Sequence, residues 1–167
     1  MVESRGTAAV LGMAVADALG ASTEFEFFQK EGLGVIKNGF SDIKNGRHGK
    51  IGIWTDDASM GLCMADSLLL NDYQFDPTHI RYLFNWWLRH GLNNGGRPHS
   101  IGLGGNISIS MDEFMYEQNP FTAEGNQFNN GNGSLMRLAP IPIAYSDKPA
   151  EAIENSRLQS LTTHNGL

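Results

Sequence analysis

Trp54-Thr55-Asp56-Asp57 stands directly before a long helical pattern, which continues from Ala58 to Leu70. Apolar and small residues return there at steps of three and four, as on the buried side of an amphipathic helix. These residues are Met60, Cys63, Met64, Ser67 and Leu68. We therefore predict a helix with one buried face that begins close to Thr55, with Cys63 as part of the core rather than a nucleophile.

Thr55, Asp56 and Asp57 place three oxygen-bearing side chains side by side at the start of this helix. One interpretation is a helix cap, because threonine caps well and first-turn aspartates gain ~0.3–1 kcal/mol from the helix dipole. The other is a metal site, because clustered oxygen ligands suit Mg²⁺ or Mn²⁺. Taken alone, the motif favours the cap. However, two adjacent carboxylates repel each other, and a cation would use both.

The composition is that of an ordinary folded protein of one domain, with 167 residues, 41% of them hydrophobic and 18% charged. The formal charge is −6 and no run of Lys or Arg occurs, so nucleic acid is not an expected partner. Cys63 is the single cysteine, which excludes a disulfide within the chain. No signal peptide or membrane span is visible, so we expect a cytoplasmic protein without a membrane partner.

Further helical patterns fill most of the remaining sequence. They cover Gly6–Leu19 before a cap at Gly20, Pro77–His90 between Asp76 and Gly91, Ile101–Tyr116, Leu135–Tyr145 with an interruption near Pro140, and Ala150–Thr163. In the last of these, Ile153, Leu158 and Leu161 are expected to face inward. Residues 31–52 read as a loop, and no alternating strand of useful length is present. The sequence therefore predicts an all-α fold.

The segment Asn129–Arg137 is rich in glycine and asparagine and leads into a predicted helix. Backbone N–H groups in such a loop can cradle a phosphate, although a tight turn explains the same residues. Arg137 lies between Met136 and Leu138, so we expect it to be buried and paired with an acidic residue or, less favourably, with an anionic ligand. Glu24 and His164 have no distinguishing context of their own: one reads as an exposed loop carboxylate, the other as a lone histidine near a helix end.

Four blocks occur in order and together resemble the ADP-ribosylglycohydrolase family. They are Asp17-Ala18-Leu19-Gly20 with Glu24-Phe25, then Gly52-Ile53-Trp54-Thr55-Asp56-Asp57, then Gly131-Asn132-Gly133-Ser134-Leu135-Met136-Arg137-Leu138-Ala139-Pro140, and finally Thr163-His164. Each block is moderately specific, and four in order make the match strong. The resemblance covers nearly the whole chain, but only the N-terminal part of the family's usual domain.

The resemblance implies an all-α orthogonal helical bundle with a binuclear Mg²⁺ or Mn²⁺ centre. It implies hydrolysis of the bond between ADP-ribose and a protein side chain or small molecule, so an ADP-ribosylated protein or ADP-ribose conjugate is the expected partner. Carried over by position, the metal ligands are Thr55, Asp56 and Asp57. Glu24 resembles the catalytic acidic residue, together with Asp56 and Asp57. The substrate-binding residues are Gly131, Asn132, Gly133, Ser134 and His164, and Asp17 resembles a residue that supports the metal ligands.

The family completes its metal centre with a downstream Asp-x-Asp motif, and residues 1–167 contain none. We therefore expect a single partial, apparently truncated domain with half of the metal ligands missing and uncertain catalytic competence. The alternative function is that of a non-catalytic relative, either an ADP-ribose-binding protein or a structural protein, since some members of the family are lens crystallins.

Overall fold

The computed structural model describes residues 2–21, 53–100, 102–125 and 131–166. The helices are α1 (Val2–Gly20), α2 (Asp56–Leu70), α3 (Pro77–His90), α4 (Gly105–Glu117), α5 (Pro140–Ala144) and α6 (Pro149–Leu161). No strand occurs in these ranges, so the all-α prediction is confirmed for them. None of the described helices has the length and apolar character needed to cross a membrane. The predicted loop at 31–52 lies outside the described residues.

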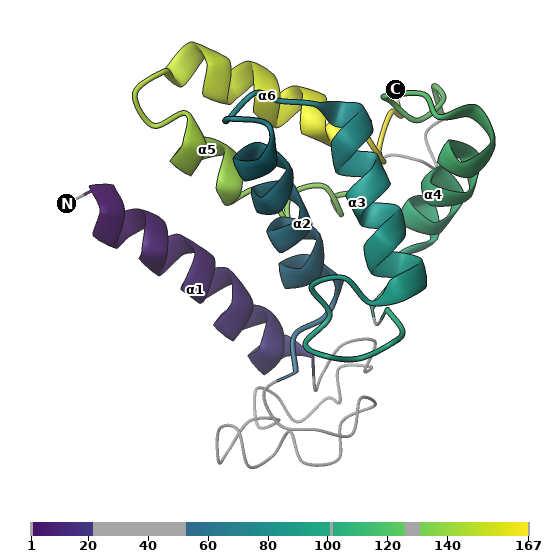
Figure 1. Ribbon diagram of the computed structural model, residues 1–167, viewed down its shortest axis with the longest axis horizontal. Helices are drawn as coiled ribbons and strands as arrows, with labels where there is room; N and C mark the ends of the chain where they lie inside the picture. Colours follow the sequence, from purple (N-terminus) through teal and green to yellow (C-terminus); the bar gives the residue numbers. More distant parts are fainter. Residues whose placement is uncertain (1, 22–52, 101, 126–130, 167) are drawn as a thin grey trace, which may run out of the picture.

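Helix α2 is the centre of the bundle (Figure 1). It packs against α1, α3 and α5, while α4 contacts α3 and α6 contacts α5. All five residues of its predicted inward face are buried, and they meet Ile80, Phe84 and Trp87 of α3. Each large apolar side chain removed from water contributes roughly 1.5–3 kcal/mol. The amphipathic pattern therefore predicted the core correctly.

Cys63 lies in this core and is fully buried. Burial raises the pKa of its thiol to about 12, with the nearby charge of Asp66 acting in the same direction. The reactive form of cysteine is the thiolate, which this environment suppresses. The prediction that Cys63 is a structural residue is confirmed.

The ends of α3 follow the sequence signals closely. The Asp76 carboxylate accepts a hydrogen bond from the backbone N–H of His79 at 3.0 Å, and Pro77 occupies the first turn. Gly91 ends the helix in the left-handed conformation, with φ of 74°. Of the two tryptophans, Trp87 is buried and Trp86 is partly exposed.

Two predicted helices are shorter than expected. Helix α4 begins at Gly105 rather than Ile101, because Gly102 has φ of +83° and Gly104 has extended backbone, so neither continues a helix. The predicted helix Leu135–Tyr145 is wrong over its first part: residues 133–137 form turns, and α5 begins only at Pro140. Proline suits the first position of a helix and cannot continue one from the residues before it.

Helix α6 does not bury the apolar residues that its pattern indicated. Ile153 is 73% exposed, and Leu158 and Leu161 are only half-buried. The buried residue of this helix is Gln159, whose side chain accepts from Arg137 and donates to the carbonyl of Ser134. The hydrogen bonds of Gln159 therefore decide which face of α6 is buried, and the inward position predicted for Ile153 is wrong.

Candidate functional site

The first turn of α2 is capped by a carboxylate from a different helix. Asp17 of α1 accepts hydrogen bonds at 2.9 Å from the backbone N–H groups of Thr55 and Ala58. Its other oxygen accepts from the Thr55 hydroxyl at 2.7 Å. Thr55 occupies the N-cap position but makes no capping bond with its side chain. The cap interpretation was therefore right about the position and wrong about the side chain.

A pocket of about 660 Å³ opens between α1, the first turn of α2 and residues 135–139. Asp17, Thr55 and Asp57 line it together with apolar and small side chains. The two helices approach closely because Gly61 of α2 faces Met13 of α1: a methyl group at Gly61 would lie 2.6 Å from the Met13 side chain. Three of the predicted site residues thus share one pocket.

The oxygen-bearing side chains at this site are of the type that binds a hard divalent cation. Asp57 is half-buried, and burial raises the pKa of its carboxyl, with the negative charge of Asp17 adding to the effect. A cation would relieve this crowding of negative charge. Thr55, Asp56 and Asp57 could supply three of the roughly six oxygen positions that Mg²⁺ prefers. No group of three or more His, Cys, Asp or Glu placed to hold a metal is found in the described ranges. Glu24 lies outside them.

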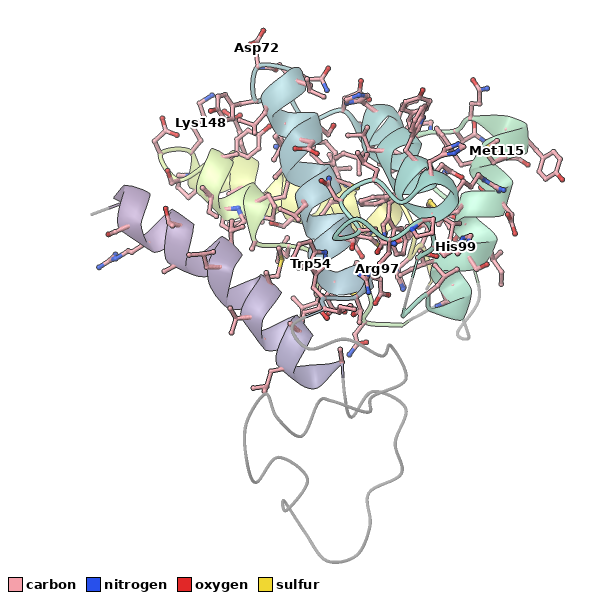
Figure 2. The ribbon with its side chains drawn as sticks, turned by 60° about the horizontal axis from the view of Figure 1, so that its bottom comes forward. Trp54, Asp72, Arg97, His99, Met115 and Lys148 are labelled. Atoms are coloured by element: carbon pink, nitrogen blue, oxygen red, sulfur yellow. The ribbon has the colours of Figure 1, made fainter. Side chains whose placement is uncertain are left out.

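The loop after α3 braces the residue before this site (Figure 2). Arg97 donates to the backbone carbonyl of Trp54, and its Nε donates to the carbonyl of Asn94 at 2.8 Å. The indole N–H of Trp54 donates to the carbonyl of Asn93 at 3.0 Å. Burial lowers the pKa of Arg97, and the charge of Asp17 opposes that shift. Two residues of one loop, Asn93 and Arg97, therefore hold Trp54, the residue that leads into Thr55.

Gly102 lies directly against Asp56. A methyl group built there would collide with the carboxylate of Asp56, and the φ of +83° also favours glycine. Asp56 is almost fully buried, with 4% of its surface exposed. Sequence reasoning missed Arg97 and Gly102. The cluster of glycines at 102–105 was the available sequence signal for Gly102.

The Gly131–Gly133 loop and His164 lie close together. A methyl group built on Gly133 would lie 3.1 Å from Nε2 of His164, and one on Gly131 would lie 3.4 Å from the same atom. Asn106, at the start of α4, also reaches this loop: its amide nitrogen would lie 3.1 Å from the methyl group on Gly131. A side chain at position 133 would therefore press on the imidazole, whereas one at position 131 would press mainly on the Asn106 amide. Asn106 had no sequence signal.

The other two residues of the loop point elsewhere. The Ser134 hydroxyl is 2.8 Å from the hydroxyl of Ser160 on α6. Asn132 is exposed, and its carbonyl accepts from the N–H of Leu135 at 2.9 Å. The Ser134 hydroxyl thus makes a contact within the fold, whereas the Asn132 side chain is accessible to solvent beside the loop.

Arg137 is fully buried, as predicted, but its partners differ from those expected. It donates to Gln159, Thr162 and Thr163, and its guanidinium lies 4.7 Å from the centre of the Phe84 ring. Within the described residues no carboxylate forms an ion pair with it. Burial lowers its pKa, and the charge of Asp56 opposes the shift. Among the described residues, neutral oxygens from the end of α6 and the residues after it bind the guanidinium in place of the predicted acidic partner.

The two groups of residues are joined by one segment of chain. Gly131 and Gly133 contact His164, and Leu135 and Met136, immediately after them, line the pocket that contains Asp57. A ligand in the pocket would therefore have oxygen ligands on one side and the glycine loop close by. Such a site can hold a molecule that offers hydroxyl groups at one end and acceptor oxygens at the other.

The chain is similar to several known proteins over nearly its whole length. The family model for ADP-ribosylglycohydrolase matches residues 1–166. The ADP-ribosylarginine hydrolase Tri1 of Pseudomonas putida (strain GB-1) is 32% identical over 96% of this chain and 42% of its own length. The ADP-ribosyl-[dinitrogen reductase] glycohydrolase of Rhodospirillum rubrum is 31% identical over 98% of this chain and 52% of its own.

A solved structure described as an ADP-ribosylglycohydrolase-related protein complex superposes with a TM-score of 0.72 at 31% identity, covering 99% of this chain and 50% of that chain. The chain thus spans about half the length of the relatives it matches. The family match and the ordered site residues agree. The chain belongs to the ADP-ribosylglycohydrolase family.

Proposed function

We propose that this chain acts in the hydrolysis of ADP-ribosyl linkages, with an ADP-ribosylated protein as substrate. The main support is that Asp17, Thr55 and Asp57 line one pocket together with Leu135 and Met136, which follow the Gly131–Gly133 loop in the chain. The relatives' names supply the reaction, and one of them specifies ADP-ribosylarginine. An arginine linkage is therefore the first substrate to test.

Thr55, Asp56 and Asp57 would hold Mg²⁺ or Mn²⁺ in this proposal. Such an ion, when bound, orients ribose hydroxyls and lowers the pKa of bound water. Asp17 fixes the Thr55 hydroxyl and the first turn of α2, and Gly102 leaves space for the Asp56 carboxylate. These residues therefore set the orientation of the ligands before any substrate arrives.

The reaction breaks the bond between the anomeric carbon of ADP-ribose and the side-chain nitrogen. Water adds its oxygen to that carbon, and a proton goes to the departing nitrogen. The transition state resembles an oxocarbenium ion, which nearby carboxylates stabilise. In the proposal Glu24 accepts the proton of the attacking water, a role carried over from the family. The glycine loop and His164 hold the ADP-ribose phosphates and distal ribose.

A release assay tests this function. The chain is incubated with Mn²⁺ or Mg²⁺ and an ADP-ribosylated arginine peptide, and free ADP-ribose is measured by chromatography. Asp56→Asn and Asp57→Asn should each lower release at least ~100-fold and abolish Mn²⁺ binding by calorimetry. Asp112→Asn is the matched control, since Asp112 is an exposed carboxylate on α4 paired with Arg89 at 3.1 Å.

A second candidate is a non-catalytic ADP-ribose-binding protein. It is favoured by the donor set in the described residues, which includes only two carboxylates at the proposed metal position. Binding of ADP-ribose without release, in the presence of Mn²⁺, would support this candidate. If the chain neither binds nor releases ADP-ribose, both functions are excluded.

A further inference from the structure

His164 has one ring nitrogen engaged inside the protein and one turned toward the glycine loop. Its Nδ1 is 2.8 Å from Oγ1 of Thr163. Its Nε2 faces Gly131 and Gly133 and makes no hydrogen bond with the part of the chain that the structure describes. The side chain is only 8% exposed. For a buried imidazole at a predicted ligand site, the question is which nitrogen carries the proton.

The direction of the Thr163–His164 hydrogen bond follows from a third residue. Arg137 donates from Nη2 to Oγ1 of Thr163 at 2.7 Å, and a guanidinium has no acceptor. Thr163 must therefore accept from Arg137, so its own hydroxyl proton points elsewhere. Among the described residues the only acceptor within reach of that proton is Nδ1 of His164. The hydroxyl donates, Nδ1 accepts, and the proton of the neutral imidazole resides on Nε2.

We propose that Thr163, oriented by Arg137, is a positioning residue that fixes His164 as the Nε2–H tautomer and directs this donor into the Gly131–Gly133 loop. The inference rests on the proposed function for the identity of the ligand, an acceptor-rich group such as a phosphate or ribose hydroxyl of ADP-ribose. The Asn106 amide beside Gly131 adds donor groups to the same place. Thr163 acts through His164 and does not itself contact the ligand.

Electrostatics support a permanently neutral donor. Burial, and to a lesser extent the positive charge of Arg137, lower the pKa of His164 to about 4. Arg137 is the one charged side chain that both orients Thr163 and acts on His164. At neutral pH His164 therefore serves as a hydrogen-bond donor and does not exchange protons with the substrate.

Long-range ¹H–¹⁵N NMR spectra of histidine rings distinguish the two neutral tautomers and the imidazolium. The chain contains five histidines, so His164→Gln identifies the signal of His164. The native protein should show the Nε2–H pattern from pH 5 to 8. Thr163→Val should produce a mixture of tautomers, and Thr163→Ser should restore the native pattern.

Thr162→Val is the matched control. Thr162 also accepts from Arg137, at 3.1 Å, but no bond joins its side chain to His164, so its removal should leave the tautomer unchanged. The proposal is overturned if native His164 carries its proton on Nδ1 or is an imidazolium at pH 7. It is also overturned if Thr163→Val keeps the Nε2–H pattern intact.

Calorimetry with ADP-ribose separates this inference from the function on which it rests. Thr163→Val should weaken binding about fivefold to tenfold, as expected for one misdirected hydrogen bond, and Thr162→Val should not. If the native chain does not bind ADP-ribose, the proposed function fails, while the NMR spectra still decide whether Thr163 sets the tautomer.

Discussion

The first turn of α2 and the surroundings of His164 differ in charge: the first is rich in carboxylates, and the second contains a buried guanidinium. The first turn of α2 brings the carboxylates of Asp17, Asp56 and Asp57 close to backbone N–H groups, so this region has an excess of negative charge. The second surrounds a buried guanidinium with neutral oxygens and ends in hydrogen-bond donors. One region is suited to a cation and the other to an acceptor-rich ligand. A site with both features can bind the two ends of one molecule.

The comparison predicts that the His164 region depends most on Arg137. Arg137→Met should lower the free energy of unfolding by about 3–4 kcal/mol, because it leaves the side chain of Gln159 and the hydroxyls of Thr162 and Thr163 without their donor. Urea unfolding measures the loss. Arg157→Met, on the exposed side of α6 where Arg157 pairs with Glu154, should change nothing measurable. Equal effects in the two variants would contradict the role given to Arg137.

The α2 region should depend on Asp17 in a similar but smaller way. Asp17→Ala removes three hydrogen bonds to one carboxylate and should cost about 2–3 kcal/mol. Amide hydrogen exchange should accelerate in the first turn of α2 before it does elsewhere. Asp112→Ala, which breaks only the surface pair with Arg89, is the control. Unchanged exchange at Thr55 and Ala58 in Asp17→Ala would show that the cap is not needed.

The buried imidazole predicts a pH dependence that the carboxylate region does not share. The folded pKa of His164, about 4, lies below the ordinary histidine pKa of 6.5, so the unfolded chain binds more protons between these values. The contribution of His164 to the free energy of unfolding is therefore fully present above pH 6.5. It decreases as the pH drops toward 4, by about 2 kcal/mol at pH 5. His164→Gln should remove this part of the slope. An identical slope in the variant would mean that other groups cause it.

Glycine substitutions separate backbone strain from contact with Asp56. Gly96 and Gly102 both have positive φ, of +77° and +83°, but only Gly102 lies against Asp56. Gly96→Ala should cost about 1 kcal/mol, and Gly102→Ala about 1 kcal/mol more. Gly102→Ala should also weaken Mn²⁺ binding several-fold. If the two variants lose equal stability and bind Mn²⁺ equally, the contact with Asp56 carries no function.

Local patterns predicted the features that depend on neighbouring residues. The buried face of α2, the cap at Asp76 and the stop at Gly91 all follow from spacing and from the conformations that individual residues allow. The inward position of Ile153 was wrongly predicted, because the apolar pattern of α6 does not reveal that a buried polar side chain orients the helix. Gln159 turns α6 through its bonds with Arg137 and Ser134, which lie far from it in sequence.

The candidate site was predicted from ordered blocks rather than from geometry. The blocks brought Asp17, Thr55, Asp57, Gly131 and His164 into consideration, and the structure places them around two adjacent clusters. What the sequence could not supply was the set of contacts between the blocks. The cap that Asp17 gives to α2, the brace from Arg97 and the reach of Asn106 are all tertiary, and no local pattern encodes them. The metal and the role of Glu24 stay predictions.

The carboxylate of Asp17 also links the formation of the site to the docking of α1 on α2. Thr55 and its two aspartates have their native orientation only after α1 has docked on α2, since the residue that holds them is 38 positions earlier in the chain. An intermediate with α1 undocked would contain the same ligands in a disordered arrangement. If Thr55, Asp56 and Asp57 hold a metal ion as proposed, metal affinity should emerge with the docking of α1 and not with the formation of α2.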